Sequence, residues 1–507
     1  MVLERRRVLR VGGFLLAFLA VAVPSWLFLF THSSEEMVFA SHDAIVQPNL
    51  DGRVRLDMGP YLPDLRTSTG GRIGVAVEMG KTTATTTPEL AERYAAIAAR
   101  PEAEVRRVEQ AVISLAVNAA LGAVALGLVP IALWLLVGPR RRAQLWRRRW
   151  QPLDWRVAIA VTAVAAIVVM LVPKPWDPEV DRVQPDTWIP VQDAVTDVTV
   201  PQGLNGWEIQ GGLVTRGTRR LLSSLFDTYD RSKVFYAGVI DRVDDIADQL
   251  RRPEEGETVA VLVSDRHDNI GMDEVVRAVA DEAGATVVLD AGDDTSTGET
   301  WEEFSLDSLD SAFEGYDFRA AISGNHDNGT FVNRHLESLG WTHFDGKSVM
   351  AFDGVRMTGV DDPRSSGLGT WRDEKGLSFD EVKASIADDV CDLDEQGDRI
   401  ATLLVHDANL GATALARGCT DLVLAGHVHA QIGPTRRVGT NAKAGYTYTN
   451  GTTGGAAYAI AIGSKLRRDA QFSFITYREG RPVGIQPVTV RTTGELVAAD
   501  YIPLDLG

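Results

Sequence analysis

Residues 258–269 read TVAVLVSDRHDN, an apolar run that ends in a cluster of charged and polar side chains. A short run this rich in Val and Leu predicts a strand that is buried on both faces. Further apolar runs end in the same way at 286–289, 318–322, 401–405 and 421–424, and they lead into DAGDD (290–294), SGNHD (323–327), HD (406–407) and AGHVH (425–429). Residues 273–283 have helical spacing, so we expect strands to alternate with helices in an α/β fold.

The polar clusters follow the strands at their carboxyl ends, where open α/β sheets bind their ligands. Five of the nine histidines lie in these clusters, together with Asp and Asn but no cysteine. Leaving so many polar groups at adjoining strand ends without a function would be costly. Carboxylate, imidazole and amide oxygen ligands suit Mn, Fe or Zn. The clusters therefore predict a site for two divalent metal ions, which can stabilise an in-line displacement at a phosphoryl group.

The motif order D-x-H, GD, GNHD, H and GH-x-H resembles that of the calcineurin-like metallophosphoesterase superfamily over residues 256–460. The resemblance implies an α/β/β/α sandwich with a dinuclear metal centre. The implied ligands are Asp265, His267 and His429 for the first metal, Asn325, His406 and His427 for the second, and Asp293 as the bridge. The resemblance gives His326 a catalytic role instead, in which it stabilises the transition state and protonates the leaving oxygen.

Four neighbouring residues are candidates for supporting the ligands or contacting substrate: Arg266, Asp268, Asp294 and Asp327. Asp268 stands where a small residue is common in the superfamily, and it brings a further carboxylate near the metals. Asp294 is an alternative bridge, although the Gly-Asp order favours Asp293. Ala430 replaces a frequent glycine after GH-x-H without removing a ligand. The Gly-rich stretch 450–455 resembles a late turn of the family, which we expect to shape the edge of the site.

The charge is divided unevenly along the 507 residues. Lys and Arg number 51 against 69 Asp and Glu, a formal net charge of −18, which argues against a nucleic-acid partner. Residues 1–173 carry 20 basic and 14 acidic side chains (+6), whereas residues 174–507 carry 31 and 55 (−24). The basic part contains uncharged runs at 11–31, 111–139 and 157–173, each of a length that predicts a membrane-spanning helix, the third marginally.

Arginines fix the expected orientation. Arg5, Arg6, Arg7 and Arg10 precede the first run, and seven arginines lie in the loop 140–156, so both segments belong in the cytoplasm. The expected division is a cytoplasmic N-terminus (1–10), a first span (11–31), an extracytoplasmic segment (32–110), a second span (111–139), a cytoplasmic Arg-rich loop (140–156), a third span (157–173), an extracytoplasmic collar (174–255) and the metallophosphoesterase domain (256–507). The first run could instead be a cleaved signal peptide with a site at Val38-Phe39-Ala40, but its length favours an uncleaved anchor.

The two extracytoplasmic segments outside the last domain read as β-rich. Strands are expected at 53–58 and 72–79 and helices at 88–100 and 219–230, and we expect the two segments to pack into a small module near the membrane. The chain has only two cysteines, Cys391 and Cys419, too few for a disulfide scaffold. An extracytoplasmic location permits a disulfide between them, and two free thiols are the alternative.

The leading hypothesis is a multi-pass membrane protein whose extracytoplasmic domain hydrolyses phosphomonoesters or phosphodiesters. Its expected partners are a phosphoester substrate and the lipid bilayer, and the sequence identifies no protein partner. The alternative is a membrane scaffold or envelope-assembly subunit that uses the same domain mainly for binding. An intact ligand set argues against this alternative, and a metal analysis would discriminate between the two.

Overall fold

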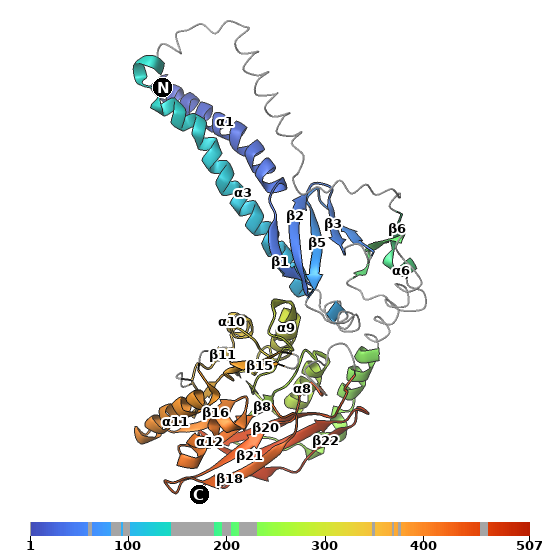
Figure 1. The fold of residues 1–507 in the computed structure, drawn as a ribbon, viewed down its shortest axis with the longest axis vertical. Coiled ribbons are helices and arrows are strands. Elements are labelled where there is room, and N and C mark those ends of the chain that lie inside the picture. The colour runs from blue at the N-terminus through green and yellow to red at the C-terminus, as the bar shows by residue number, and fades with distance from the viewer. Residues whose placement is uncertain are drawn as a thin grey trace. The chain divides into compact units, whose positions relative to one another are not determined.

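Figure 1 shows the computed structural model of the chain. The structure describes residues 2–58, 63–82, 93–94, 102–142, 187–194, 204–211, 231–346, 350–367, 370–373, 377–456 and 465–507. Two compact units are present, residues 1–84 with 104–222 and residues 85–103 with 223–507. Each unit is described by itself below.

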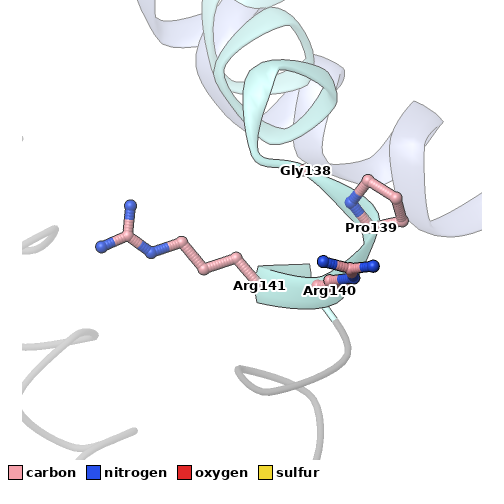
Figure 2. A pocket seen from close by; sticks show the side chains of 4 residues that line it. All are labelled: Gly138, Pro139, Arg140 and Arg141. Atoms are coloured by element: carbon pink, nitrogen blue, oxygen red, sulfur yellow. The ribbon is translucent and has the colours of Figure 1, made fainter.

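The first unit contains two long apolar helices, α1 (Val2–Thr31) and α3 (Glu102–Leu136). Both are long and apolar enough to cross a membrane, over Val11–Thr31 and Ala103–Leu136. The second helix ends at Leu136, three residues before the predicted end of the span at residue 139. A shallow pocket in the turn that follows is lined by Gly138, Pro139, Arg140 and Arg141 (Figure 2). The predicted third span, 157–173, lies outside the described residues.

The two helices pack closely through small residues. The Trp26 indole N–H donates to the Ala116 carbonyl (3.2 Å), and Phe30 packs against Leu115 and Ala119. A methyl group on Gly127 would lie 2.8 Å from the Phe18 ring. Glycine and alanine allow such close approach between helices, a feature typical of helix pairs in membranes.

A seven-stranded sheet completes the first unit, in the order β1-β2-β5-β3-β4-β7-β6. Its strands are β1 (Glu35–Phe39), β2 (His42–Asn49), β3 (Arg53–Asp57), β4 (Leu65–Ser68), β5 (Gly74–Thr82), β6 (Trp188–Pro190) and β7 (Glu208–Gln210), with the short helix α6 (Val191–Ala194) between the last two. The strands expected at 53–58 and 72–79 correspond to β3 and β5. β4 pairs with β7 through Leu65 and Ile209, so segments far apart in the sequence share one sheet. The helices expected at 88–100 and 219–230 lie outside the described residues, except for residues 93–94, which are helical.

The second unit is built on two sheets. The first has the order β11-β10-β9-β8-β20-β21-β22 with β23 paired to β21, and the second has the order β12-β13-β16-β17-β19-β18. The first consists of β8 (Glu257–Val263), β9 (Val287–Asp290), β10 (Phe318–Ala321), β11 (Thr342–His343), β20 (Ala470–Arg478), β21 (Arg481–Val490), β22 (Leu496–Ala498) and β23 (Ile502–Pro503). The second consists of β12 (Met350–Phe352), β13 (Val355–Val360), β16 (Ile400–Val405), β17 (Thr420–Ala425), β18 (Ile432–Val438) and β19 (Ala444–Thr449). A separate hairpin pairs β14 (Arg364–Gly367) with β15 (Thr370–Asp373).

The two sheets face each other across a buried apolar layer that includes Leu262, Leu289, Leu404 and Tyr477. The outer face of the first sheet is covered by α8 (Gly271–Glu282), α9 (Glu303–Ala312) and α10 (Phe331–Ser338), with the 3₁₀ helices η3 (Val243–Gln249) and η4 (Thr300–Glu302). The outer face of the second sheet is covered by α11 (Phe379–Glu395) and α12 (Ala408–Arg417). The unit is therefore an α/β/β/α sandwich, as expected, and the five predicted strands are β8, β9, β10, β16 and β17.

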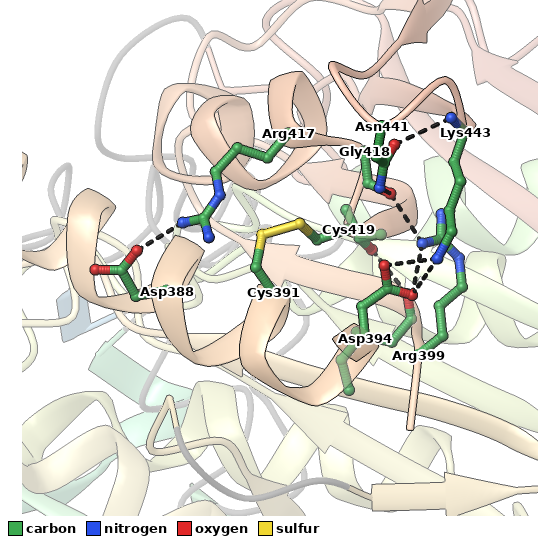
Figure 3. The surroundings of a disulfide bond; sticks show 11 residues. Asp388, Cys391, Asp394, Arg399, Arg417, Gly418, Cys419, Asn441 and Lys443 are labelled. Carbon is green, nitrogen blue, oxygen red and sulfur yellow. Dashed lines mark hydrogen bonds and ion pairs between the residues drawn. A yellow bond between two sulfur atoms is a disulfide. The ribbon is translucent and has the colours of Figure 1, made fainter. Parts of the chain in front are cut away.

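Cys391 on α11 and Cys419 just before β17 form a disulfide in the structure (Figure 3). Both residues are buried in the apolar layer between the helices α11 and α12 and the second sheet. Charged side chains surround the bond at the surface, where Asp394 accepts hydrogen bonds from Arg399 (3.0 Å) and Lys443 (2.7 Å). The disulfide therefore ties α11 to the start of β17.

Candidate metal centre

The polar clusters meet at one edge of the sandwich because the strands that carry them are parallel within each sheet. β8, β9 and β10 run parallel to one another, and so do β16 and β17 in the second sheet. Loops from the two sheets are joined by hydrogen bonds, such as that from the Asp362 N–H to the Ser323 carbonyl (3.0 Å) and that from the His427 N–H to Asp265 Oδ1 (3.0 Å). The sandwich therefore brings all seven predicted ligands together.

One group of ligand atoms consists of Asp265, His267 and His429, whose atoms all lie within 4.8 Å of one another. His429 Nε2 lies 3.3 Å from Asp265 Oδ1 and 3.0 Å from His267 Nε2. The other ring nitrogen of His429 contacts the Ala456 carbonyl (3.2 Å). A carbonyl oxygen can only accept, so Nδ1 carries the hydrogen of this bond. In the neutral ring Nε2 then directs a lone pair at Asp265 and His267.

A second group consists of Asp293, His406 and His427, again within 4.8 Å of one another. His406 Nε2 lies 3.1 Å from Asp293 Oδ2 and 3.1 Å from Asn325 Oδ1. The Nδ1 atom of His406 contacts the Ala291 carbonyl (2.7 Å), so Nε2 again faces two acceptors with its lone pair. Asp293 Oδ2 also lies 3.9 Å from His267 Nε2, which places this oxygen between the two groups.

Carboxylate oxygens and imidazole nitrogens that converge this closely need a positive charge between them, either a proton on the ring or a metal ion. Both groups have this arrangement, and both consist of carboxylate, imidazole and, in the second, amide ligands. His406 and His429 donate hydrogen bonds to the carbonyl groups of Ala291 and Ala456. Bonds of this kind fix a metal-binding histidine in one tautomer. The residues therefore fit a pair of divalent metal ions.

Protonation differs among the proposed ligands. Burial opposes protonation of His406 and His429, but Asp293 and Asp265 outweigh it and raise the pKa of the two rings, so each would release a proton when a metal binds. Burial lowers the pKa of His267 to about 3, so the imidazole is neutral at physiological pH. Burial opposes ionisation of Asp293, but His406 and the other nearby imidazoles outweigh it and lower the pKa of this carboxyl. Burial raises the pKa of the Asp265 carboxyl, but the protonated rings of His429, which donates to it, and His406 outweigh burial and lower this pKa. Both carboxylates are therefore charged, as metal ligands must be.

The loops that hold the ligands are strained and tightly packed. Six site residues adopt a positive φ although none is glycine, namely Asp265, His267, Asp268, Asp293, His427 and His429. Such conformations persist only where the surroundings enforce them, and they cluster at functional sites. Gly426 leaves no space for a side chain against this loop, because a methyl group there would lie 2.6 Å from Asp265 Oδ2. Gly324 likewise leaves no space for a side chain against the Asp293 carboxylate.

His326 lies beside the two groups, and its ring centroid is 5.1 Å from that of His267. Its backbone N–H donates to Asp293 Oδ1 (2.7 Å), and its Nδ1 contacts the Ser296 carbonyl (3.1 Å). The Nδ1 atom is therefore the donor, and Nε2 is the nitrogen that can exchange a proton with another group. Nε2 lies 3.0 Å from Ser366 Oγ.

The four supporting candidates are buried and contact the loops. Arg266 makes two hydrogen bonds to the Asp273 carboxylate (2.9 and 2.7 Å) and one to Asp294 Oδ1 (2.9 Å). Asp327 accepts from the backbone N–H groups of Asp293 (2.8 Å) and Gly324 (2.9 Å), among others. Arg266 is only 1% exposed and is bound to Asp294, so these side chains support the ligand loops on their buried side.

Asp268 belongs to a second buried network. It accepts from the Ser296 N–H (3.0 Å) and hydroxyl (2.5 Å), and Glu302 accepts from the same N–H (2.8 Å). Burial raises the pKa of Asp268 to about 6, and burial together with Asp268 raises the pKa of Glu302 well above its ordinary value. This carboxyl pair holds the loop whose Ser296 carbonyl contacts His326.

The Gly-rich stretch 450–455 packs beneath the first ligand loop. The Thr452 hydroxyl donates to the Asp265 carbonyl (2.8 Å), and the Thr453 N–H donates to the Ser264 carbonyl (2.8 Å). A further group of possible metal ligands, Glu303, Asp307 and His335, lies on α9 and α10. There His335 already pairs with Asp307 (2.8 Å), so this group reads as a contact between helices.

Three residues with clear roles in this geometry were not predicted from sequence: Ser296, Glu302 and Ser366. Ser366 lies on β14, in a stretch (RSSG) without apolar periodicity, and no sequence signal marks it. Glu302 has a weak local signal, since it ends a capping box that begins at Glu299. Their positions depend on contacts between loops that are distant in the sequence.

No protein-family model matches the chain, and no curated protein matches it. Among solved structures, NAD nucleotidase (NadN) of Haemophilus influenzae is 16% identical with a TM-score of 0.30, over 49% of this chain and 50% of that one. A novel archaeal phosphodiesterase is 12% identical (TM-score 0.27, 49% of this chain and 100% of that one). The protein TT1561 of Thermus thermophilus is 11% identical (TM-score 0.30, 48% and 98%). The match thus spans half the length of the nucleotidase, and likenesses of this size identify no activity.

The second unit combines its layers, motifs and ligand groups at one edge. An α/β/β/α sandwich carries D-x-H, GD, GNHD, H and GH-x-H in this order at the carboxyl ends of its strands, and these motifs form two adjoining ligand groups. This is the arrangement that the resemblance to the calcineurin-like metallophosphoesterases predicts.

Proposed function

We propose that the second unit is a dinuclear-metal phosphoesterase that hydrolyses phosphomonoesters or phosphodiesters. The observation that carries the proposal is the position of Asp293 Oδ2, 3.1 Å from His406 Nε2 and 3.9 Å from His267 Nε2. One carboxylate oxygen shared by two groups of acceptors fits a bridging ligand between two metal ions. Such pairs of ions occur in phosphatases and nucleases.

In this proposal Asp265, His267 and His429 would hold the first ion, Asn325, His406 and His427 would hold the second, and Asp293 would serve both. The ligand set suits Mn, Fe or Zn. When bound, the two ions would polarise a phosphoryl oxygen and increase the acidity of a water molecule. They also reverse the local potential, so the −24 balance of residues 174–507 does not exclude a phosphate substrate.

His326 is the proposed general acid. The Ser296 carbonyl holds its Nδ1–H at 3.1 Å, which fixes the ring and leaves Nε2 to protonate the departing alkoxide oxygen. The edge-to-face contact with His267 and the backbone hydrogen bond to Asp293 keep the ring beside the ligand groups. Neither Arg266 nor Asp294 contributes to proton transfer in this mechanism, because each is committed to the buried ion pair behind the loops.

We also propose that the chain is anchored in a membrane with the phosphoesterase outside the cytoplasm. Support comes from the two apolar helices, α1 and α3, and from the arginines that precede the apolar part of α1 and follow α3. The signal-peptide alternative fits less well. Cleavage after Ala40 would remove β1, whose Val38 and Phe39 pair with Asp43 and His42 of β2. The third span, 157–173, remains part of the proposal on sequence grounds.

The test uses the full chain, purified in detergent, supplied with Mn²⁺ and assayed on an aryl phosphodiester and an aryl phosphomonoester. His326→Ala and Asp293→Ala are expected to lower kcat at least ~100-fold. His335→Ala is the matched control, because this histidine pairs with Asp307 on the helices and is expected to keep full activity. Unchanged hydrolysis by both site variants would refute the proposed site.

A further inference from the structure

The hairpin formed by β14 and β15 carries a hydroxyl into the site. Ser366 on β14 is 3% exposed, and its Oγ accepts a hydrogen bond from the Asn325 amide Nδ2 (2.7 Å). The same Oγ lies 3.0 Å from His326 Nε2. One hydroxyl therefore joins a proposed metal ligand to the proposed general acid, and neither the motifs nor the resemblance assigns it a role.

The hairpin is fixed at its base. The Ser366 N–H donates to the Asn325 carbonyl (2.7 Å), and the Asp362 N–H donates to the Ser323 carbonyl (3.0 Å). Arg364 donates to Asp362 (2.6 Å) and to Asp407 (2.8 Å), the residue after His406. These bonds attach the strand to the loops of both sheets, so the position of the hydroxyl is set by the fold.

The first consequence concerns the amide of Asn325. An amide side chain can turn over and exchange its oxygen with its nitrogen at small steric cost. With Nδ2 donating to Ser366, Oδ1 must point the other way, where it lies 3.1 Å from His406 Nε2 among the ligand atoms. When the hydroxyl donates its one hydrogen to His326 Nε2, only its lone pairs remain for Asn325, so the amide must turn Nδ2 to Ser366 and its oxygen, the atom that can bind a cation, toward the second ligand group.

The second consequence concerns the ring of His326. The Ser296 carbonyl holds Nδ1 at 3.1 Å and Ser366 holds Nε2 at 3.0 Å, so both ends of the imidazole are fixed. A hydroxyl that already accepts from Asn325 can donate its own hydrogen to Nε2 or accept one from it with a second lone pair. The hydroxyl thus holds the neutral ring as a donor, and when the ring is protonated its Nε2–H leaves Oγ to reach the departing oxygen.

We propose that Ser366 is a positioning residue that orients Asn325 toward the second metal ion and aims His326 at the leaving oxygen. The proposal rests on the proposed function of the site. It predicts that one hydroxyl controls two properties that are measured separately, the affinity for metal and the sensitivity of hydrolysis to the leaving group.

The experiment compares Ser366→Ala, Ser366→Thr and Ser365→Ala in the full chain. The first removes the hydroxyl, the second retains one, and the third is a control on the same strand, whose hydroxyl bonds to Asn328. Mn²⁺ affinity is measured by calorimetry on apo protein, without substrate. kcat is measured on aryl phosphodiesters whose phenols span several pKa units, and thermal unfolding confirms that each variant folds.

For Ser366→Ala we expect roughly 10- to 100-fold weaker binding of one Mn²⁺ ion, the usual effect of removing a group that orients a metal ligand. We also expect kcat to fall more for phenols of high pKa, which depend most on protonation. Ser366→Thr should recover most of both properties, and Ser365→Ala should match the wild type. Wild-type Mn²⁺ affinity and leaving-group dependence in a folded Ser366→Ala protein would overturn the proposal. If instead Asp293→Ala binds as much Mn²⁺ as the wild type, the proposed metal centre itself has failed.

Discussion

Removal of the disulfide between Cys391 and Cys419 should measurably destabilise the second unit. The bond closes a loop with a sequence separation of 28, and both cysteines lie in the apolar layer under α11 and α12. We would replace both by alanine, because a buried serine hydroxyl would add an unsatisfied polar group. The loss is therefore expected to come mainly from the greater freedom of the unfolded chain.

The magnitude follows from the length of the loop. Loop-closure entropy for a separation of 28 corresponds to about 3.6 kcal/mol at 25 °C. For a unit of about 300 residues this lowers the melting temperature by roughly 6 °C. The neighbouring ion pair between Arg417 and Asp388, also drawn in Figure 3, is exposed and is worth less than about 1 kcal/mol, so Asp388→Ala serves as the control.

Thermal unfolding would be followed by tryptophan fluorescence, with Trp301 and Trp341 as buried reporters in this unit. Oxidised wild-type protein should melt about 6 °C above the double alanine variant, and a reductant should lower only the wild-type value. Equal melting temperatures, or an equal effect of reductant on both proteins, would refute the reasoning.

Three further predictions concern the site. Arg266→Met leaves the buried carboxylates of Asp273 and Asp294 without their cation and should lower the free energy of unfolding, measured with denaturant, by about 3–5 kcal/mol. Arg277→Met, which breaks an exposed pair with Asp281, should lower it by less than about 1 kcal/mol. Similar losses in the two variants would contradict the prediction. Gly324→Ala should lower both activity and Mn²⁺ affinity, because its methyl group collides with the Asp293 carboxylate, while Gly238→Ala, with nothing within 4 Å, should not. Burial raises the pKa of Asp268 to about 6, so the folded protein keeps a proton that the unfolded chain releases from about pH 4 upward. Stability should fall as the pH rises from about 4 to about 6, and Asp268→Asn should make this slope shallower in apo protein, while Glu302 and Asp327, whose pKa values are also raised, keep the remainder. An unchanged pH dependence of stability in Asp268→Asn would mean that another group holds this proton.

The sequence predicts the framework of the second unit well because its strands are short apolar runs that end in polar clusters. Residues 258–264 and 401–405 became β8 and β16 with shifts of about one residue. The same pattern predicts which residues come together, since parallel strands bring their carboxyl ends to one edge. The pairing of Leu65 with Ile209 in the first unit had no comparable signal, because β6 and β7 are only three residues long.

Much of the detail at the site depends on the fold and has no sequence signal. Asp265 and His267 adopt a positive φ, which is uncommon for residues other than glycine and which no pattern in the sequence marks. Ser366 is one of many serines until the hairpin carries it against Asn325 and His326. Asp268 could be expected near the ligands, but its pairing with Glu302 requires the loop 296–302 to fold back over it. Local patterns thus predict the ligands, and contacts between distant loops decide how the ligands are held.

The central claim is that Asp293 joins two metal sites, and metal counting tests it most directly. Full-length protein, loaded with Mn²⁺ and freed of excess metal, would be analysed by mass spectrometry beside Asp293→Ala and the control His335→Ala. We expect roughly two ions per chain in the wild type and the control, and fewer than about one in Asp293→Ala. Wild-type protein without stoichiometric metal, or an Asp293→Ala variant that retains both ions, would contradict it.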